Sequence, residues 1–428
     1  MKQVSFASEQ GYSQRSCLRH EPPGSCPGHD SSRTGMPSAS RAGMPSASQT
    51  RRSHVLLVVL LAVLCCSVVA VAGTPCDSIE PLLGDLQAII EHAVSCGQAK
   101  GISAAIIFPE GGVWVGTSGA SHGTVLIAPD TAFAAGSIGK SFTAAVVHQL
   151  AEEGALSLDD PIGKHLPAFA RIDPTIPIRL LFNHRSGLYQ FIRYPGFWET
   201  ILNEPDRWWS PEAILEGFVI APYFEPGDSF HYSQTNYTLL RMLIEQVTGH
   251  RIDIAYRERF FEPLGFEHAF TTPYEPQPAD SAHGWWDLDG DGTYDDFSVV
   301  SRVSFGSAIM GEIFCTAEEL ARWARALYVD RVVLSEDSLA EMLDFYSPCP
   351  GEPILAGYGL GAVSYAPEVF GGLTVWGHSG NAPGYAAASL YLPDYDVCIG
   401  FMDNTEKGDA MPALVELLTA VTTWLGKE

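Results

Sequence analysis

Ser137 and Lys140 are the residues whose types and spacing most directly suggest chemistry. An apolar pattern of helical period follows the break at Gly136. Ser137 is therefore predicted to lie at a helix start, where unpaired N–H groups and the positive dipole end favour a developing anion, with the Lys140 amine on the same helix face. A serine needs a neighbouring base to become a strong nucleophile, and lysine can serve when burial and nearby cations lower its pKa. A Ser-x-x-Lys pattern alone is more often a capped helix with a surface lysine.

Two later segments carry polar groups beside turn signals. Tyr232 follows a Pro-Gly turn at 226–227 and precedes an apolar helical pattern. Its phenol can move a proton if it faces cations, although tyrosines are also common in cores. His378-Ser379-Gly380 combines a titratable ring, a hydroxyl and a glycine that lets a substrate approach a strand backbone. The same composition is typical of a polar β-turn.

The elements that must position these groups come from both ends of the chain. Helices are predicted over 79–93 and 411–424, and strands over 101–108, 113–116, 374–378, 386–392 and 397–402. The middle, from about 140 to 330, is mostly helix and loop. One sheet built from both termini and flanked by their helices is expected.

The first 72 residues are not expected to belong to the folded domain. Residues 1–50 are rich in Ser, Gly, Pro and Arg, which predicts disorder. Residues 51–72 hold two arginines, an apolar run and a small-x-small cleavage pattern, as a secretory signal peptide does. This pattern favours export to the periplasm or the extracellular space over an anchor through residues 55–72, a run near the lower length limit for spanning a bilayer. Translation is then expected to start at Met36 or Met44, close to the signal peptide.

The charge of the chain argues against nucleic-acid binding, and its cysteines argue against a disulfide framework or a cysteine metal site. The 428-residue chain has a formal net charge of −25, which repels nucleic-acid phosphates. The cysteines after the predicted signal peptide are odd in number and scattered, so they give neither a disulfide framework nor a metal spacing. They are Cys76, Cys96, Cys315, Cys349 and Cys398. Neither a required cofactor nor an obligate protein partner is expected.

In their order along the chain, the three chemical segments resemble the serine β-lactamase and D-alanyl-D-alanine-peptidase superfamily. The similar branch holds class C β-lactamases, D-Ala-D-Ala carboxypeptidases and related esterases, with Ser-x-x-Lys, then Tyr-x-Asn, then Lys-or-His-x-Gly. Residues 180–188 look like the family's "LLxHTSGL", and residues 307–327, which include Thr316-Ala317-Glu318-Glu319-Leu320, look like its "GGLxSTAxDL". The resemblance covers about 77–428.

The resemblance implies an α/β (α+β) fold, in which an antiparallel sheet is flanked by helices from both chain ends. A mostly helical lobe is inserted at about 150–305, and the site lies between sheet and lobe. Ser137 would attack a carbonyl while Lys140 and Tyr232 manage its proton. Which of the two is the acylation base stays open.

The same resemblance assigns the substrate-binding groups. The N–H groups of Ser137 and Asn381 would form the oxyanion hole. His378 and Ser379 would line the carboxylate side of the substrate, along the strand that Gly380 leaves accessible. One residue departs from the pattern: Gln234 stands where the family has Asn, and its amide is one methylene longer. A displacement of about an ångström can cost on the order of a hundredfold in rate.

These features predict an exported serine hydrolase acting through an acyl-enzyme on an ester or D-amino-acid amide, with a small molecule or peptide as substrate. A class C-type β-lactamase is the first alternative. His378 weighs against it, because a histidine near its reference pKa of about 6.5 is mostly neutral and attracts a penicillin carboxylate weakly. A non-catalytic penicillin-binding relative is the second alternative, and Gln234 is the feature in its favour.

An acidic segment suggests a separate metal site. Asp287, Asp289, Asp291 and Asp295 occupy positions 1, 3, 5 and 9 of a loop with Gly at position 6, like the start of a calcium loop. Position 12 is Ser298 instead of a bidentate glutamate. Asp-Gly is also a turn signal, so an acidic hairpin tip explains the segment equally well. Structural calcium is therefore an expectation with an open alternative.

Overall fold

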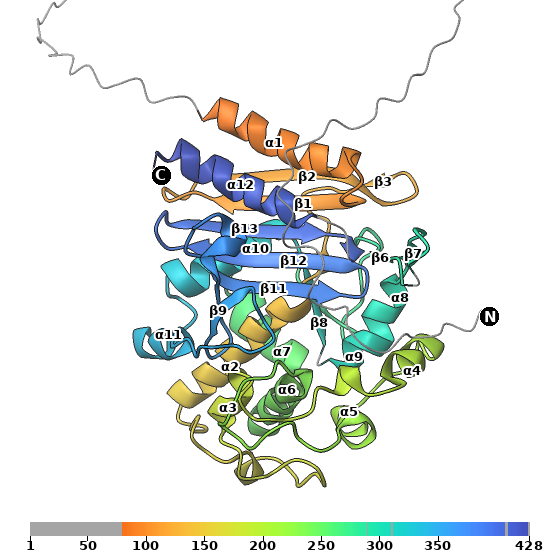
Figure 1. Ribbon diagram of the computed structural model, residues 1–428, viewed down its shortest axis with the longest axis vertical. Coiled ribbons are helices and arrows are strands. Elements are labelled where there is room, and N and C mark those ends of the chain that lie inside the picture. The colour runs from red at the N-terminus through yellow and green to blue at the C-terminus, as the bar shows by residue number, and fades with distance from the viewer. Residues whose placement is uncertain (1–78, 289, 310, 407–409, 427–428) are drawn as a thin grey trace, which may run out of the picture. The chain divides into compact units, whose positions relative to one another are not determined.

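Strands from both ends of the chain build one eight-stranded antiparallel sheet (Figure 1). The computed structural model describes residues 79–288, 290–309, 311–406 and 410–426, so the predicted segments 1–50 and 51–72 lie outside the described residues. The strand order is β3-β2-β1-β13-β12-β11-β10-β9. The bounds are β1 Gly101–Ile107, β2 Val113–His122, β3 Val125–Leu126, β9 Leu355–Tyr358, β10 Val363–Tyr365, β11 Trp376–Ala382, β12 Tyr385–Leu392 and β13 Val397–Asp403. The direct pairing of β1 with β13 confirms the predicted sheet.

Helices cover both faces of this sheet, as the residues of its central strands require. Every residue of β1 and β13 is buried, in keeping with their nearly continuous apolar sequences. On one face α1 (Glu80–Ser95) packs against β2 and α12 (Met411–Trp424), and on the other α10 (Ala317–Ala324) packs against β13, β1 and β12 (Figure 1). Gly400 lets α10 approach closely, since a Cβ there would lie 1.9 Å from the Ala317 carbonyl oxygen. The predicted fold class is confirmed.

The middle of the chain is mostly helical and is joined to the sheet by short strands. Its helices are α2 Gly139–Glu152, α3 Ile178–Phe182, α4 Phe197–Asn203, α5 Pro211–Phe218, α6 Gln234–Thr248, α7 Ile252–Tyr256, α8 Ser298–Val300, α9 Gly306–Ala308 and α11 Glu336–Met342. A small antiparallel sheet has the order β4-β8-β5, formed by Phe133–Ala134, Glu312–Cys315 and Phe270–Thr272. Helices α3 to α8 fall in the range where the helical lobe is expected. No helix within the described residues is long and apolar enough to cross a membrane.

The structure differs from the sequence prediction most at β11. The predicted strand ends at 378, whereas β11 continues to Ala382. Its glycine, serine and asparagine are typical of a turn, but Ser379 pairs with Ala388 and Asn381 with Ala386 in β12. The neighbouring strand therefore imposes the extended conformation, which local composition could not reveal.

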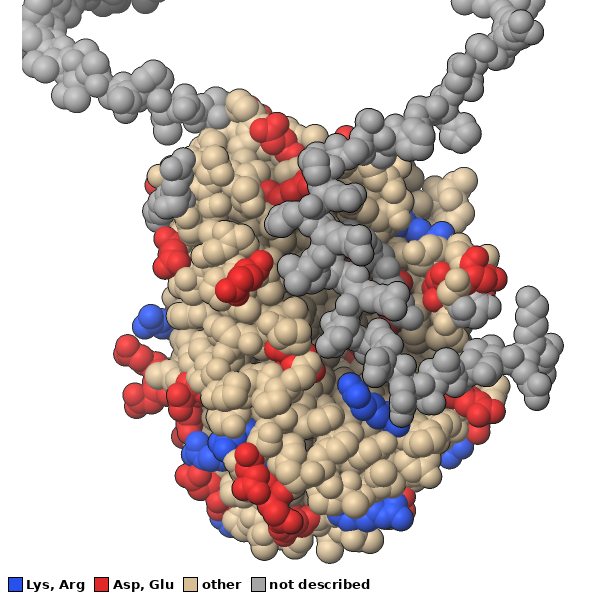
Figure 2. Space-filling model, viewed as in Figure 1, with Lys and Arg blue, Asp and Glu red and all other residues tan. Residues whose placement is uncertain are grey.

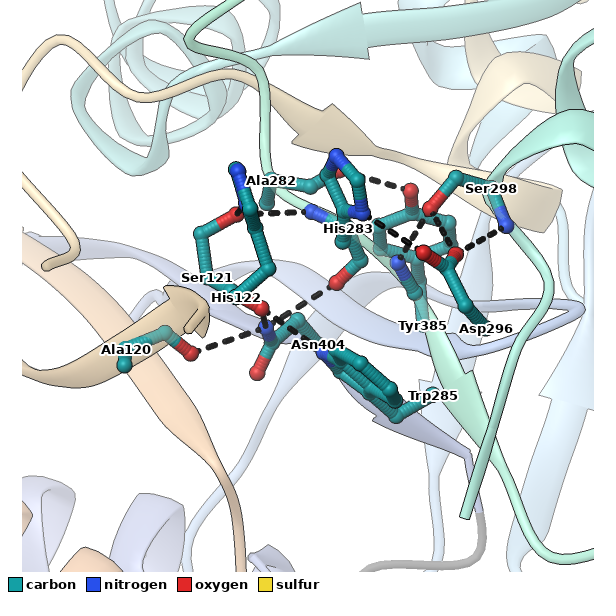
Figure 3. A network of polar contacts seen from close by, with 11 residues as sticks. Ala120, Ser121, His122, Ala282, His283, Trp285, Asp296, Ser298, Tyr385 and Asn404 are labelled. Atoms are coloured by element: carbon teal, nitrogen blue, oxygen red, sulfur yellow. Dashed lines mark hydrogen bonds and ion pairs between the residues drawn. The ribbon is translucent and has the colours of Figure 1, made fainter. Parts of the chain in front are cut away.

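A network of polar contacts holds β2 to the segment that precedes β6 (Trp285–Trp286) (Figure 3). We call Ser121, His283, Asp296, Ser298 and Asn404 the histidine network. The Ser121 hydroxyl accepts from the His283 N–H at 2.9 Å, and His283 Nδ1 lies 2.7 Å from Asp296 Oδ2. The Asn404 amide nitrogen contacts three carbonyl oxygens, those of Ala120, Ser121 and His283, at 3.2, 3.3 and 3.0 Å. The rings of His283 and His122 stack at 3.8 Å. Most polar groups of this network thus have partners.

Candidate active site

The turn formed by residues 135–137, which we call the nucleophile turn, is shaped by contacts with two different strands. The Ala135 N–H donates to the Ile313 carbonyl oxygen at 2.8 Å, so the pairing of β4 with β8 continues into the turn. Gly136 follows with φ +56°, and a Cβ there would lie 2.6 Å from the backbone nitrogen of Asn381 in β11. Glycine is required both by this backbone conformation and by this close approach. A 3-10 turn (η1, Gly136–Ile138) then leads into α2, so Ser137 lies at a helix start, as the sequence predicts.

Two side chains donate to the Ser137 hydroxyl, and we call Ser137, Lys140 and Tyr232 the serine cluster. Lys140 Nζ donates to Ser137 Oγ at 3.0 Å, and the Tyr232 hydroxyl donates to the same oxygen at 2.9 Å. Lys140 is fully buried, whereas Ser137 is half-buried. The Lys140 ammonium also lies 5.0 Å from the centre of the Tyr232 ring. The structure therefore brings together the three residues predicted to manage acylation.

Burial gives Lys140 and Tyr232 different proton affinities. It lowers the pKa of Lys140 to about 7, against the opposing charge of Glu312. It raises the pKa of Tyr232, although the hydrogen bond to Ser137 opposes that change. At neutral pH a large share of the lysine amine is unprotonated, while the phenol keeps its proton.

Strand β11 lies directly against the nucleophile turn. A Cβ on Gly380 would lie 1.9 Å from the Ala135 carbonyl oxygen and 3.0 Å from the Ser137 nitrogen. Gly380 is thus needed for the turn to pack against the strand, in addition to the role in substrate access that the sequence suggests. A Cβ on Gly136 would in turn lie 2.6 Å from the Asn381 nitrogen, so turn and strand pack closely at the two residues that the resemblance assigns to the oxyanion hole.

His378 is held neutral by its surroundings. Its Nδ1 lies 2.5 Å from the Ser379 carbonyl oxygen, which can only accept, so we assign the ring proton to Nδ1. Nε2 then accepts from the Tyr358 hydroxyl at 2.9 Å. Burial, together with the charge of Lys140, lowers the pKa of His378 to about 3. The predicted carboxylate-side residue therefore offers no positive charge at neutral pH. Ser379 beside it is half-buried.

Gln234 is placed next to the serine cluster but is held by its backbone. It is the first residue of α6, and its N–H donates to Gln190 Oε1 at 2.7 Å. Among the described residues, no hydrogen bond joins its side-chain amide to Ser137, Lys140 or Tyr232. The structure thus does not bring this predicted group into direct contact with the nucleophile.

The sequence reasoning missed Glu312, Tyr358 and His184. Tyr358 lies on β9, a strand that was not predicted. His184 is fully buried, accepts from the Ser233 N–H at 3.2 Å and packs its ring 4.3 Å from the ring of Tyr232. Its place in the "LLxHTSGL" stretch could have revealed it. Glu312 could have been found by aligning "GGLxSTAxDL" on Thr316 to Leu320, because the second glycine of the motif then falls on Glu312.

The predicted calcium segment forms the tip of a hairpin between β6 and β7 (Asp295–Asp296). Asp287 Oδ2 accepts from the Gly292 N–H at 3.1 Å, and Asp291 Oδ1 from the Thr293 N–H at 2.8 Å. Asp289 lies outside the described residues. Within the described part of the chain, no group of three or more His, Cys, Asp or Glu residues is placed to hold a metal. The hairpin is thus observed, and calcium binding stays a prediction.

The described part of one face carries both acidic and basic side chains. Figure 2 shows acidic and basic side chains interspersed on the described part of one face, without a continuous basic patch there. The chain as a whole carries 50 acidic and 25 basic residues. This charge distribution agrees with the exclusion of nucleic acid.

Comparison with known proteins places the chain in a family. The Beta-lactamase family model matches residues 86–421, and the chain therefore belongs to this family. It is a serine hydrolase of that family, related to penicillin-binding proteins and D-amino-acid amidases.

The individual relatives are distant. The chain is 28% identical over 288 residues to penicillin-binding protein 4* of Bacillus subtilis (strain 168). The aligned region covers 64% of this chain and 61% of that protein, so the match spans less than two thirds of the length of that relative. The structure of a D-stereospecific amidohydrolase from Streptomyces sp. superposes with a TM-score of 0.67 at 29% identity, covering 77% of this chain and 97% of that one. The D-amino acid amidase from Ochrobactrum anthropi SV3, complexed with L-phenylalanine amide, superposes with a TM-score of 0.70 at 25% identity, covering 80% and 99%.

Proposed function

We propose that this protein is an exported hydrolase that forms an acyl-enzyme on Ser137, acting on esters or D-amino-acid amides as D-Ala-D-Ala carboxypeptidases and related esterases do. The observation that carries the proposal is the double contact at the Ser137 hydroxyl, 3.0 Å from Lys140 Nζ and 2.9 Å from the Tyr232 hydroxyl. A nucleophile and a base within hydrogen-bond reach are what covalent catalysis needs.

The proton affinities suggest a division of labour during acylation. Ser137 Oγ bonds to the substrate carbonyl carbon while its proton passes to the unprotonated amine of Lys140. The N–H groups of Ser137 and Asn381 then stabilise the tetrahedral oxyanion. When the bond to the leaving group breaks, Tyr232 donates its proton to that group, and the Lys140 ammonium returns a proton to the phenolate. Lys140 is thus the acylation base in this proposal, because burial moves its pKa toward neutrality and moves that of Tyr232 away.

The neutral His378 supports a substrate without an obligatory carboxylate. No positive charge is available from His378 at neutral pH, since its pKa is lowered to about 3. An ester or an amide of a D-amino acid needs no such charge. A D-Ala-D-Ala peptide carries a C-terminal carboxylate, as every penicillin carries a carboxylate, so the neutral ring ranks both below esters and amides among the expected substrates. The similarity to a D-stereospecific amidohydrolase and a D-amino acid amidase supports the same class.

A labelling experiment and a substrate panel test this proposal. A fluorophosphonate should form an adduct that mass spectrometry places on the Ser137 peptide. The panel compares p-nitrophenyl esters, D- and L-amino-acid amides, D-Ala-D-Ala peptides and nitrocefin. Turnover of an ester or a D-amino-acid amide is expected, and nitrocefin should be a poor substrate. A kcat/KM for nitrocefin near 10⁷ M⁻¹s⁻¹, on the order of the fastest enzymes, with negligible esterase activity would favour the β-lactamase alternative.

Export rests on the segment 51–72 and is tested separately. N-terminal sequencing of the native protein should begin near Gly73 or Thr74, just after the small-x-small pattern. A native protein that retains residues 1–50 would contradict both the signal peptide and the late start of translation.

A further inference from the structure

Glu312 is a buried acidic residue at the base of the nucleophile turn. It begins β8 and is 1% exposed. Its Oε1 accepts from the Gly136 N–H at 2.6 Å, a short contact of the kind that charged acceptors make. Its Oε2 is buried and has no hydrogen-bond partner among the described residues. A carboxyl group in such a place is costly, and the family motif has a glycine at this position. The residue therefore calls for a functional explanation.

Through its contact with Gly136, Glu312 fixes the conformation of the turn that carries Ser137. Gly136 lies between the Glu312 carboxyl on one side and the Asn381 backbone on the other. Holding its N–H fixes the φ of +56° that aims the next residue. The same turn sets the position of the Ser137 N–H relative to that of Asn381. Displacing it would therefore disturb both the nucleophile and the proposed oxyanion hole.

Glu312 also acts on Lys140 by its charge. Burial raises the pKa of Glu312 to about 7, while the Gly136 N–H and the charge of Lys140 oppose that change. The charge of Glu312 in turn raises the pKa of Lys140, which burial lowers to about 7. The two groups thus titrate in the same pH range, and their protonation steps belong to the pair.

The other titratable groups around this pair titrate outside that range. Cys315 and Tyr385 feel the negative charge of Glu312, and the pKa of each is raised. His184 and His378 feel the positive charge of Lys140, and the pKa of each is lowered. Tyr232 and Tyr237 face the Lys140 ammonium, and burial raises the pKa of each. A titration near neutral pH at this site would therefore report the pair.

We propose that Glu312 is a positioning residue for acylation: its carboxylate anchors the nucleophile turn through the Gly136 N–H and places a negative charge near Lys140. The inference rests on the proposed function, because it concerns the same hydroxyl. The new element is that an acid, which the family motif lacks at this position, sets the position of the Ser137 hydroxyl and the pKa of Lys140. The anchoring role and the charge role can be separated by substitution.

The test measures the rate of Ser137 labelling by a fluorophosphonate as a function of pH, which needs no knowledge of the natural substrate. In the wild type the rate should rise with pH near neutrality, as Lys140 loses its proton. Glu312→Gln keeps an oxygen that can accept from Gly136 but removes the charge. Without that charge the ammonium is less stable, so the rise should move to lower pH by about one unit, with a nearly unchanged plateau. Glu312→Gly removes both roles, so the same shift should come with a plateau reduced roughly 10- to 100-fold.

Two further variants complete the design. Glu312→Asp keeps the charge on a shorter side chain, so its plateau should fall while the rise stays near the wild-type pH. Glu318→Gln makes the same charge change at a partly exposed position on α10 and should alter neither quantity. Thermal unfolding of each variant checks that it is folded at the assay temperature. Replacing a buried carboxyl by an amide should not destabilise the fold strongly.

The outcomes distinguish this inference from the proposed function. If Glu312→Gln leaves the pH of the rise unchanged, or Glu312→Gly leaves the plateau unchanged, the role of Glu312 is overturned while Ser137 stays the nucleophile. If the folded wild type is not labelled at any pH, Ser137 is not activated and both proposals fail. If labelling behaves as expected but no ester or D-amino-acid amide is turned over, only the proposed substrate class fails.

Discussion

The serine cluster and the histidine network contain similar side chains, but these side chains have different electrostatic surroundings. The histidine network contains serines, an acid, an imidazole and an amide. Most polar atoms of these side chains have a hydrogen-bond partner (Figure 3). In the serine cluster, a buried amine, a phenol and the nearby Glu312 carboxyl carry pKa values moved by burial. Two of these groups share a single hydroxyl oxygen.

The difference shows why residue types alone do not identify a reactive site. Hydrogen bonds that satisfy both partners stabilise a structure and leave its groups inert. Ionisable groups that lose their contact with water on burial cost stability, and that cost appears as an altered proton affinity available for catalysis. We therefore expect substitutions in the two regions to separate activity from stability.

The largest expected effect comes from a matched pair of serines. Ser137→Ala removes the nucleophile and should lower kcat/KM on the order of 10³-fold or more, with little change in Tm. Ser121→Ala removes an acceptor from the His283 N–H and should lower Tm while kcat/KM stays within about twofold, because an unsatisfied buried group costs roughly 1–3 kcal/mol. The measurements are ester hydrolysis and thermal unfolding. Activity that survives Ser137→Ala would reject the assignment of the nucleophile.

A second pair exchanges histidine for lysine. His378→Lys introduces the lysine that the family pattern Lys-or-His-x-Gly also allows, so acylation of Ser137 by benzylpenicillin should become about tenfold faster, a change of roughly 1.4 kcal/mol. His283→Lys makes the same exchange of side chains in the histidine network and should leave acylation unaffected. Stopped-flow or mass-spectrometric acylation rates provide the readout. Equal rates in wild type and His378→Lys would show that the neutral ring does not limit penicillin recognition.

A third substitution concerns the histidine network alone. Asn404→Ala leaves three carbonyl oxygens without their shared donor. We expect Tm to fall by a few degrees, since a loss of about 1–3 kcal/mol corresponds to a modest shift in a chain of this size. The pH dependence of Ser137 labelling should not move. A shift in that dependence would mean that the two regions are coupled.

The sequence predicted the serine cluster better than the elements around it, for physical reasons. Ser137, Lys140 and Tyr232 lie beside glycine breaks and helix starts, and these local signals survive in the fold. The sheet could be predicted because apolar segments near both chain ends have the pattern of strands. The extension of β11 could not be predicted, because pairing with β12 overrides its turn-like composition. Glu312 could not be recognised as buried beside Gly136, because β8 reaches the nucleophile turn only through tertiary packing.

The smallest expected effect is calcium binding at the hairpin that follows β6. Asp287, Asp291 and Asp295 belong to this hairpin, and their oxygens are the ligands that calcium prefers. A site without the glutamate at position 12 should be weak, but the protein would meet calcium at about millimolar concentration if it is exported as proposed. A ligand that binds only the folded state raises stability as RT ln(1 + [L]/Kd), about 1.4 kcal/mol when calcium is tenfold above Kd. Tm should therefore rise by a few degrees with millimolar calcium in the wild type but not in Asp291→Ala. Asp337→Ala, at an exposed position in the first turn of α11, serves as the matched control and should keep the response. Identical unfolding curves in calcium and in chelator would leave this segment as an acidic hairpin tip, whose Asp287 and Asp291 carboxylates accept from its own backbone N–H groups.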